Sequence, residues 1–465
     1  MTRLEQVLEE ASLIVEPEES ERRHVTGMAA KLLSTCMEEF EGCEGFLSAS
    51  IEGSVAKDTW VKGRAEVDVF IHFSPDVGME KLESTILSVG GRVIEGLGGR
   101  HWLRYASHPY IEGEVEAVRV NIVGCFETGP GHWISAVDRT PYHTEFVRSR
   151  LTPELRRDIR LLKGFLIGSG LYGAEIRVEG ISGYLSELLV IGHAGFTKLL
   201  RSVAGWRPPV YIELNGSIGR AEALKQFPNA PLILPDPVDP ARNVAAAVST
   251  TKLAEFILAS KLFIRSPSVS FFKPPEMVMA EEGDRELLGV FFKVAELPPD
   301  ILWGEIKHTM RGVARRLEKE GFQVYRAGAA QSGNEVLLLY ELAGLTLPRY
   351  ELRMGPPVWM ENALDFIEKT LSRGERAAGP WVEGERLYAL LRREDTEADR
   401  LLRRWIEAGQ VAVSHGLKEE LRRAEILTSR SGLFERIKEN KDFREFLYSL
   451  LDGVSPPIRH LGRRS

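Results

Sequence analysis

A short segment near the start of the chain combines a glycine, a hydroxyl and two acidic residues, which are residue types suited to phosphate and metal chemistry. Gly53 and Ser54 form a predicted turn, and Glu66 and Asp68 follow on residues 66–72, whose alternation predicts a β-strand. A Gly-Ser turn offers backbone N–H groups and a hydroxyl to phosphate oxygens. Carboxylates two residues apart on a strand share one face, where they can hold divalent cations beside that phosphate. The segment therefore predicts metal-assisted transfer from a nucleoside triphosphate; the plainer interpretation is a tight turn and an acidic, solvent-facing strand.

The surrounding sequence predicts the elements that position these residues. Residues 25–40 carry apolar side chains at helical spacing, and residues 118–122 alternate as a strand does. The first 150 residues therefore predict a small α/β domain with a mixed sheet. The middle region is predicted to be mostly helical, with helices over residues 153–166, 185–199 and 244–257.

The second half of the chain predicts another sheet. Residues 288–294 predict a strand, residues 301–317 a helix, and residues 323–326 and 335–342 a strand pair. That order predicts an open sheet with helices on one face. Residues from about 384 onward are predicted to be predominantly helical.

Composition narrows the class of protein. The chain has 465 residues, of which 43% are hydrophobic and 27% charged, as in an ordinary globular protein. No apolar run approaches the roughly 18 residues that a membrane helix needs. Three cysteines are too few for a disulfide framework or a four-cysteine zinc site, so we expect a reducing, cytoplasmic location. The net charge of −7 gives no global sign of a nucleic-acid binder, although local basic patches remain compatible with it.

Several further motifs occur in a fixed order with the first. They are GSVAKDTW (53–60), EVDVF (66–70), RYASHPY (104–110), SAVDRTPYH (135–143), RLLK (160–163), YGAE (172–175), GISGYL (180–185), DPVDPARNVAA (236–246), ILW (301–303) and GPPVW (355–359). In this combination the chain resembles the archaeal-type (class I) CCA-adding enzymes, tRNA nucleotidyltransferases of the polymerase-beta-like superfamily.

The resemblance implies an α+β multidomain fold. Its parts would be a polymerase-beta-like nucleotidyltransferase head (1–151), a helical neck that binds nucleotide (152–266), an RRM-like body (267–383) and a helical tail (384–465). It further implies template-independent addition of C, C and A to the 3′ end of tRNA, with CTP and ATP as substrates, Mg²⁺ as cofactor and release of pyrophosphate. A homodimer and no membrane association are also implied.

Family roles fall on matching positions. Catalysis and metal binding would fall on Glu66, Asp68 and Asn121. Nucleotide binding would involve Gly53, Ser54, Lys57, Thr140, His143, Lys163, Tyr172 and Arg242, the last helping to read the incoming base. RNA binding would involve His108, Arg157 and Arg404. Each has a plainer interpretation: Lys163 as a solvated helix residue, Tyr172 as a core aromatic, Arg242 as the start of the next helix, and His143 and His108 as structural or exposed residues.

One position departs from the pattern. The third catalytic carboxylate of the family is expected where this chain has Asn121. An asparagine carbonyl can ligate a hard cation, but it has no negative charge and cannot accept the proton of the tRNA 3′-hydroxyl. On a regular strand, Glu114 and Glu116 are predicted to fall on the opposite face from Asn121. Two hypotheses follow: an active CCA-adding enzyme with a weakened metal site, and a catalytically silent homologue that binds tRNA ends or nucleotides. A poly(A)-type enzyme with the same head is a third, which the later motifs disfavour.

Basic residues cluster in two regions that could contact RNA phosphates. One lies at the predicted head–neck junction and one in the tail. The candidates are Arg148, Arg150, Arg156, Arg157 and Arg160, and then Arg400, Arg403, Arg404, Arg422 and Arg423. Solvated helix faces are the plainer interpretation of both clusters.

Overall fold

A computed structural model describes residues 2–105, 109–216, 218–274 and 282–461 of the chain. The chain divides into two compact units, residues 1–276 with 454–465, and residues 277–453. The first unit contains both the predicted head and the predicted neck, so that contacts between these two regions lie inside one unit. The division into four domains stays a prediction.

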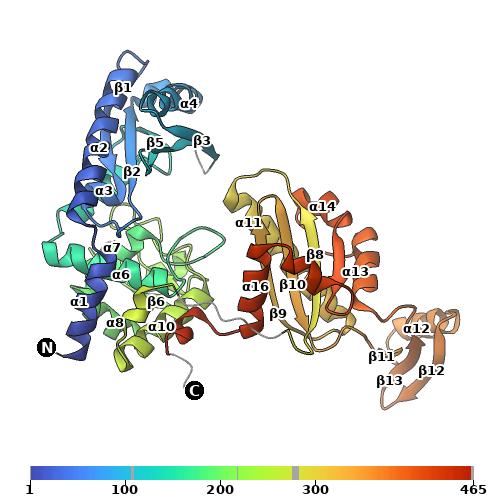
Figure 1. Ribbon diagram of the computed structural model, residues 1–465. Coiled ribbons are helices and arrows are strands. Elements are labelled where there is room, and N and C mark those ends of the chain that lie inside the picture. The colour runs from blue at the N-terminus through green and yellow to red at the C-terminus, as the bar shows by residue number, and fades with distance from the viewer. Residues whose placement is uncertain (1, 106–108, 217, 275–281, 462–465) are drawn as a thin grey trace. The chain divides into compact units, whose positions relative to one another are not determined.

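The head is built on a mixed sheet, as the sequence predicts, and this sheet has five strands. Its strands are β1 (Phe46–Glu52), β2 (Glu66–Phe73), β3 (Arg100–Tyr105), β4 (Pro109–Val115) and β5 (Val118–Phe126). They lie in the order β1-β2-β5-β4-β3, and β2 runs parallel to β5 while the other neighbours are antiparallel (Figure 1). The predicted strands at 66–72 and 118–122 are therefore central neighbours.

Two helices cover one face of this sheet. They are α2 (Glu19–Phe40) and α4 (Met79–Gly96), and their buried side chains pack on Val67, Val69 and Ile71 of β2 (Figure 1). Because successive side chains of a strand point to opposite faces, the alternate residues of β2, including Glu66 and Asp68, point to the opposite face of the sheet. Burial of one face of β2 thus fixes the direction of the acidic residues. The short 3₁₀ helix η1 (Pro75–Val77) follows β2.

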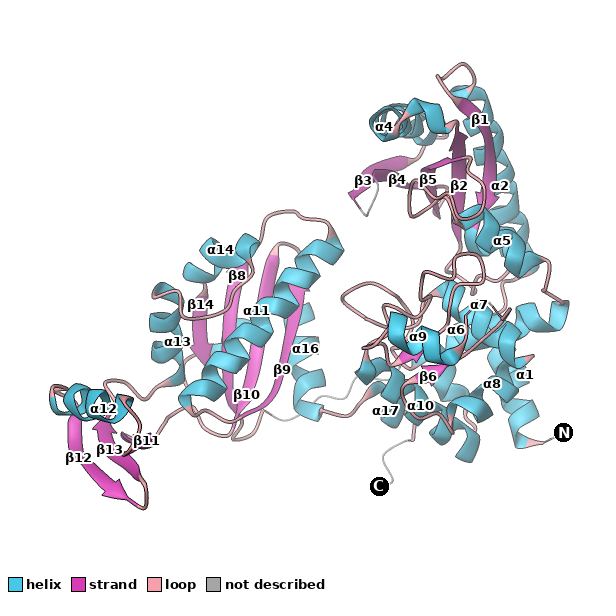
Figure 2. Ribbon diagram, turned by 180° about the vertical axis from the view of Figure 1, so that it is seen from behind, coloured by secondary structure: helices cyan, strands magenta, loops and turns pink. Residues whose placement is uncertain are grey.

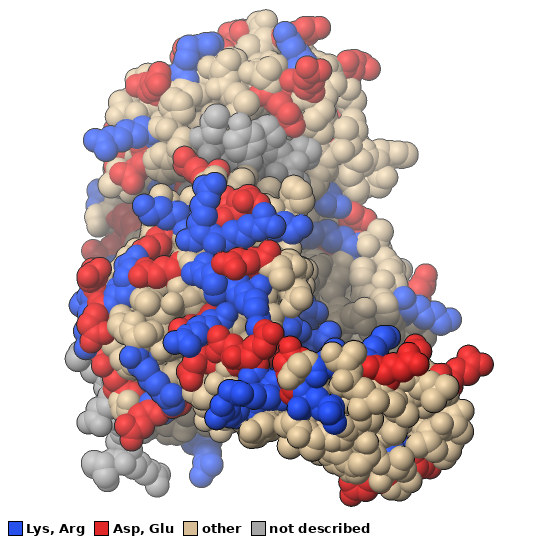
Figure 3. Space-filling view, turned by 90° about the vertical axis from the view of Figure 1, so that its right-hand side faces the viewer, with Lys and Arg blue, Asp and Glu red and all other residues tan. Residues whose placement is uncertain are grey.

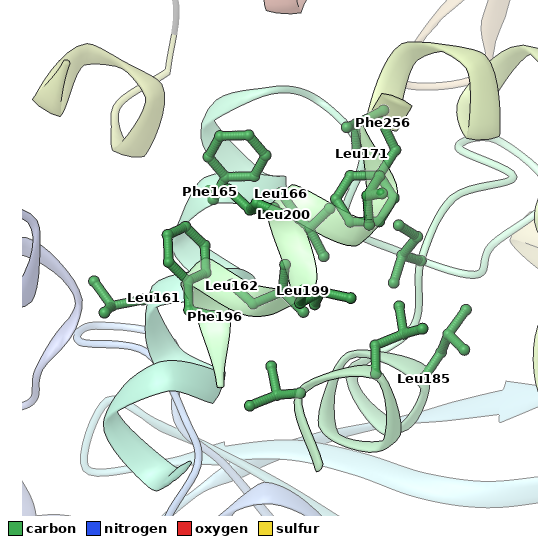
Figure 4. Close-up of a cluster of buried hydrophobic side chains, with 14 of the residues drawn as sticks. Leu161, Leu162, Phe165, Leu166, Leu171, Leu185, Phe196, Leu199, Leu200 and Phe256 are labelled. Carbon is green, nitrogen blue, oxygen red and sulfur yellow. The ribbon is translucent and has the colours of Figure 1, made fainter. Parts of the chain in front are cut away.

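The neck is a cluster of helices around an apolar core. It contains α1 (Arg3–Val15), α6 (Pro153–Gly168), α7 (Gly183–His193), α8 (Phe196–Val203), α10 (Thr250–Arg265), η2 (Val269–Phe272) and α17 (Pro456–Arg459). Figure 4 shows side chains of α6, α7 and α8 meeting in this core. Phe165 lies at its centre, with its ring centroid 5.4 to 6.0 Å from those of Phe196, Phe263, Phe271 and Phe272.

Two predicted helices of the neck have different bounds in the structure. The helix predicted over 185–199 is two helices, because Ala194 and Gly195 have φ of 51° and 125° and end α7 before α8 begins. The helix predicted from residue 244 begins only at Thr250, where Ser249 caps the first turn by accepting a hydrogen bond from the N–H of Lys252 at 3.2 Å. Smaller elements complete this unit: α3 (Gly53–Lys57), α5 (Thr140–Arg148), β6 (Val210–Tyr211), α9 (Arg220–Gln226) and β7 (Leu232–Ile233).

The second unit contains the predicted body sheet. Its strands are β8 (Glu286–Lys293), β9 (Val324–Ser332), β10 (Glu335–Leu342) and β14 (Glu425–Thr428), in the order β14-β8-β10-β9. The helices around it are α11 (Pro299–Glu320), α13 (Ala398–Glu407), η3 (His415–Leu417), α14 (Lys418–Arg422), α15 (Leu433–Lys438) and α16 (Lys441–Asp452).

The prediction that helices cover only one face of this sheet is wrong. Side chains of α11 and α13 form a core on one face, and side chains of α15 and α16 form a second core on the other. Accordingly α16 lies in front of the sheet in Figure 1 and α11 lies in front of it in the reverse view of Figure 2. Residues 336–340 of β10 are Val, Leu, Leu, Leu and Tyr without alternation and are all buried, which is the pattern of a strand buried on both sides.

A smaller sheet follows in the same unit. Its strands are β11 (Tyr350–Pro357), β12 (Arg376–Glu383) and β13 (Arg386–Arg392), with α12 (Asn362–Leu371) against them. Beyond residue 384 the chain is largely helical as predicted, but β13 and β14 also lie there. No helix in the described part of the chain combines the length and apolar character needed to cross a bilayer.

Truncating Phe165 is expected to destabilise the first unit. Phe165 is fully buried, so Phe165→Ala should lower the free energy of unfolding by about 3–5 kcal/mol, through lost burial and the cavity left behind. Leu13→Ala, at a side chain 77% exposed on α1, should change it by no more than about 0.5 kcal/mol. Urea unfolding followed by circular dichroism measures both, and equal losses would contradict the assignment of the core.

Candidate functional site

A pocket of about 480 Å³ lies between the head and the neck, inside the first compact unit. Every residue predicted to bind nucleotide lines it, as does Asp68 among the predicted catalytic residues. The lining residues are Gly53, Ser54, Lys57, Asp68, Ala136, Arg139, Thr140, His143, Thr144, Lys163, Tyr172, Ser182, Gly183, Tyr184, Glu187 and Arg242. Residues as far apart in the sequence as Gly53 and Arg242 therefore meet around one cavity, although their functional roles stay predictions.

The Gly-Ser motif lies at the end of β1, where the chain turns into α3. Gly53 has φ of +68°, and a Cβ there would come within 2.1 Å of Oδ2 of Asp68. Only glycine fits this position, because a side chain would be strained and would displace the carboxylate. The turn thus holds Ser54 and Asp68 side by side at the pocket wall.

Asp68 and Asn121 form a direct pair across the central strands. They are register partners of β2 and β5, and Nδ2 of Asn121 donates to Oδ1 of Asp68 at 2.8 Å. Burial raises the pKa of Asp68 to about 6, while the hydrogen bond from Asn121 opposes that shift. Asn121 is therefore adjacent to a predicted metal ligand, at the position where the family resemblance predicts a third carboxylate.

Glu66 lies one pleat further along β2 and is more exposed. Its Oε1 lies 3.2 Å from Nη1 of Arg119, its register partner on β5. The prediction that Glu114 falls on the opposite face from Asn121 is wrong. Glu114 belongs to β4 and pairs with Arg119, and Arg119 lies on the same face of β5 as Asn121 because the two are two residues apart. Residues 116 and 117, both with positive φ, turn the chain between β4 and β5. The alternation of side chains along a single strand therefore could not predict which face Glu114 occupies.

Two lysines of the pocket share one buried carboxylate. Lys57 Nζ lies 2.6 Å from Oε2 of Glu187, and Lys163 Nζ lies 3.0 Å from Oε1. Thr59 donates to Glu187 at 2.6 Å and accepts from Lys163 at 3.1 Å. Burial alone would raise the pKa of Glu187, but Lys163 and Lys57 hold it below its usual value. Two cations against one anion leave this buried group with one net positive charge.

A second buried carboxylate organises the opposite wall. Asp236 is fully buried, and its Oδ2 lies 2.7 Å from Nη1 of Arg242 and 2.8 Å from Nε2 of His143. Burial alone would raise the pKa of Asp236, but His143, the N–H of Val238 and Arg242 hold it at about 2. The His143 ring stacks on Tyr184 with centroids 4.2 Å apart. Arg242 and His143 are thus oriented from behind by the same ionised group.

The segment carrying Thr140 is held by an internal carboxylate. Buried Asp138 accepts hydrogen bonds from the N–H groups of Phe126, Ile134 and Ser135 at 3.0, 2.9 and 2.6 Å. These bonds join the end of β5 to the loop before α5, whose first residue is Thr140. Thr140, which lines the pocket, therefore follows a loop whose backbone is held by hydrogen bonds.

The predicted RNA-binding residues do not gather in this pocket. Arg157 is exposed on α6 and donates to Ser12 at 2.8 Å, and Arg404 is exposed on α13 and lies 2.7 Å from Glu394. His108 lies outside the described residues. Arg160 is 2% exposed and donates to the carbonyl oxygens of Trp60 and Asp58, so its assignment to an RNA-contacting patch is wrong. On the face shown in Figure 3, basic and acidic side chains are interspersed.

The sequence analysis missed three carboxylates that position the pocket residues, namely Asp138, Glu187 and Asp236. One signal was available for Glu187, which is the only charged residue in the mostly apolar run 185–191. A charge inside a buried helix needs a partner, and here two lysines supply it. Asp138 and Asp236 lie within recognised motifs but in loops, where hydrophobic periodicity does not predict which way a side chain points.

Oxygen donors are available for a hard cation at Asp68, Glu66 and Asn121. Within the described ranges, no three His, Cys, Asp or Glu side chains lie close enough together to hold a metal ion. The predicted ligand set thus contributes two carboxylates and an amide.

Comparison with known proteins gives matches over most of the chain. Residues 157–273 match the family described as "tRNA nucleotidyltransferase, second domain", and residues 284–429 match that described as "CCA-adding enzyme, C-terminal domain". A CCA-adding enzyme of Pyrobaculum neutrophilum is 38% identical over 414 residues, which cover 88% of this chain and 95% of the relative. CCA-adding enzymes of Methanopyrus kandleri and Saccharolobus islandicus are 37% and 35% identical, over 90% and 85% of this chain and 90% and 91% of theirs.

Removing the charge of Glu187 is expected to destabilise the first unit strongly. Glu187→Gln leaves two buried lysines without their anion, which should cost about 3–5 kcal/mol of unfolding free energy. The matched control is Glu19→Gln, whose partner Arg23 lies 3.9 Å away with both side chains 76% exposed, and which should cost no more than about 1 kcal/mol. Denaturant unfolding compares the two, and a loss no larger than the control's would refute the buried pairing.

Proposed function

This chain belongs to the family of CCA-adding enzymes, and from that membership and the pocket we propose that it adds C, C and A to the 3′ end of tRNA. CTP and ATP are the substrates, pyrophosphate is released, and no nucleic-acid template is used. The observation that carries the proposal is the buried group of Lys57, Lys163 and Glu187, which presents one net positive charge to a pocket lined by hydroxyls. The alternative, a silent homologue, is motivated by Asn121 alone.

The triphosphate is proposed to bind along the wall shared by head and neck. Hydroxyl donors come from Ser54, Thr140 and Tyr172, and cationic donors from Lys57 and Lys163. Phosphate oxygens accept charge-assisted hydrogen bonds, which are stronger than neutral ones. Since Glu187 already holds both lysine side chains in place, little rotamer entropy is lost when phosphate arrives.

The base is proposed to meet Arg242. The Arg242 side chain is 39% exposed and its guanidinium is held at one end by Asp236, so that its remaining N–H donors are available to acceptors on C or A. Tyr184 and His143 stack beside it and limit where a planar ring can lie. One arginine accepts two bases because both present acceptor atoms on an edge.

The donor set fits Mg²⁺. Asp68 and Glu66 supply carboxylate oxygens and Asn121 an amide carbonyl, which are the hard ligands that Mg²⁺ prefers, and Oδ2 of Asp68 stands against Gly53 at the pocket wall. When bound, the ion supplies neutralisation of the charge that develops on the triphosphate. Asn121 cannot take a proton from the tRNA 3′-hydroxyl, whereas its neighbour Asp68 can. We therefore assign proton acceptance to Asp68 and orientation of Asp68 to Asn121.

RNA contact is proposed to involve phosphates and helical shape, because all tRNAs share the CCA end. Arg157 and Arg404 are exposed and available for such contacts. His108, the homodimer and the cytoplasmic location likewise stay predictions from the family resemblance and the cysteine count.

The direct test is extension of tRNA that lacks its CCA end. Native protein is incubated with Mg²⁺, CTP, ATP and this tRNA, and products are resolved at single-nucleotide resolution. We expect addition of C, C and A in order. If the native chain gives no product at high enzyme concentration while Asn121→Asp gives clear product, the silent homologue is favoured. If neither protein extends or binds tRNA, the proposal of CCA addition is refuted.

Lys163 is expected to determine nucleotide affinity. Lys163→Met keeps the length of the side chain but removes its charge-assisted hydrogen bonds, so binding of CTP and ATP should weaken by about 1.5–3 kcal/mol, roughly 10- to 150-fold. Lys252→Met makes the same change at a partly buried lysine that pairs with Glu255 outside the pocket, and should leave affinity unchanged. Calorimetric titration with each nucleotide measures both, and equal affinities in the two variants would contradict the assignment.

A further inference from the structure

An ion pair joins the head to the neck beside the pocket. Arg139 directly precedes α5 in the head, and its Nη1 lies 2.6 Å from Oδ2 of Asp239 in the neck. The side chains of Arg139 and Asp239 are only 17% and 14% exposed, so the pair is largely removed from water and is screened little by salt. Both residues lie within the sequence motifs, yet the family resemblance gave a role to neither.

Arg139 is tied to the triphosphate wall by the chain itself. It is followed by Thr140, the first residue of α5 and a proposed donor to the triphosphate, and both residues line the pocket. The loop before them is held by the hydrogen bonds of Asp138. Nε of Arg139 is buried without a hydrogen-bond partner among the described residues. The guanidinium is therefore oriented chiefly by Asp239.

Asp239 is tied to Arg242 by a loop that hydrogen-bonds to itself. The N–H of Arg242 donates to the carbonyl oxygen of Asp239 at 2.9 Å, and the N–H of Asp236 donates to the carbonyl oxygen of Arg242 at 2.9 Å. The N–H of Val238 donates to Oδ1 of Asp236 at 3.0 Å inside the same loop. Because these bonds close residues 236–242 into one piece, a displacement of Asp239 also displaces Arg242.

The ion pair thus lies between the two proposed parts of nucleotide recognition. On the head side it adjoins Thr140, which is proposed to bind the triphosphate, and on the neck side it adjoins Arg242, which is proposed to meet the base. Burial lowers the pKa of His143, while its hydrogen bond to Asp236 raises it. The charges of Arg242 and Arg139 lower it further, so both guanidinium groups act on this one ring of the pocket wall.

We propose that Arg139 and Asp239 are positioning residues for the base contact, which fix the distance between the triphosphate donors and Arg242. Such a distance matters because a hydrogen bond weakens steeply when its length and angle depart from the preferred values. Without the ion pair, residues 236–242 keep their internal bonds but lose this tie to the head. The inference rests on the proposed function for the roles of Thr140 and Arg242.

The test compares ligands with and without a base by calorimetric titration of the full chain. CTP and ATP carry a base, whereas inorganic tripolyphosphate offers only the phosphates. Asp239→Asn removes the ion pair and should weaken binding of CTP and ATP by about 5- to 30-fold, with the affinity for tripolyphosphate changed by less than about twofold. Glu255→Gln makes the same change at a carboxylate 14% exposed that pairs with Lys252 outside the pocket, and should alter none of the three affinities.

A variant at the other end of the ion pair tests whether the two residues act through one contact. Arg139→Gln should also weaken binding of CTP and ATP, and the double variant Arg139→Gln with Asp239→Asn should lose no more than the weaker-binding single variant. The double variant leaves neither charge of the pair without its partner. It therefore decides the question if Asp239→Asn alone fails to fold.

Equal weakening of nucleotide and tripolyphosphate binding would overturn the proposal, because the ion pair would then support the pocket as a whole. Unchanged affinities for CTP and ATP in the folded variants would overturn it too, as would single losses that add in the double variant. If the native chain extends tRNA and one of these results is found, only this inference fails. If the native chain binds neither CTP nor ATP, the proposed function fails with it.

Discussion

The site depends on one buried carboxylate with two cationic partners. Glu187 of α7 binds Lys57 from the head and Lys163 from the neck, and removing Glu187 would leave two buried positive charges without an anion. Since the lysines come from sequence positions more than one hundred residues apart, the pairing ties α3 to α6 and α7. It also contributes positive charge to the pocket, so that the feature that joins head and neck is the same one to which we propose the triphosphate binds.

Other buried carboxylates of this unit also hold pocket residues in place. Asp236 orients Arg242 and His143, and Asp138 fixes the loop that leads to Thr140. Each is satisfied by hydrogen bonds or ion pairs in the absence of ligand. Glu52 is the exception, because one of its oxygens is buried without a donor.

The sequence predicts the local elements well and their long-range pairing less well. Strands β2 and β5 and helices α2 and α6 follow from periodicity, because each buries one face. Their register does not follow from it, so the position of Glu52 opposite Asp68 was not foreseen and Glu114 was placed on the wrong face. The break between α7 and α8 was missed because Ala194 adopts a left-handed conformation that its residue type does not announce. The second face of the body sheet was missed because α15 and α16 come about one hundred residues after β10. Most pocket residues were nevertheless named through the family motifs, whereas the carboxylates behind them needed the three-dimensional contacts.

A crystal structure of the full chain with CTP and Mg²⁺ tests the shared pocket most directly. The account predicts the triphosphate within hydrogen-bonding distance of Ser54 and of the Lys163 ammonium, with Glu187 still in contact with both lysines. A nucleotide bound elsewhere, or bound at the head with Lys163 directed away from its phosphates, would contradict the account.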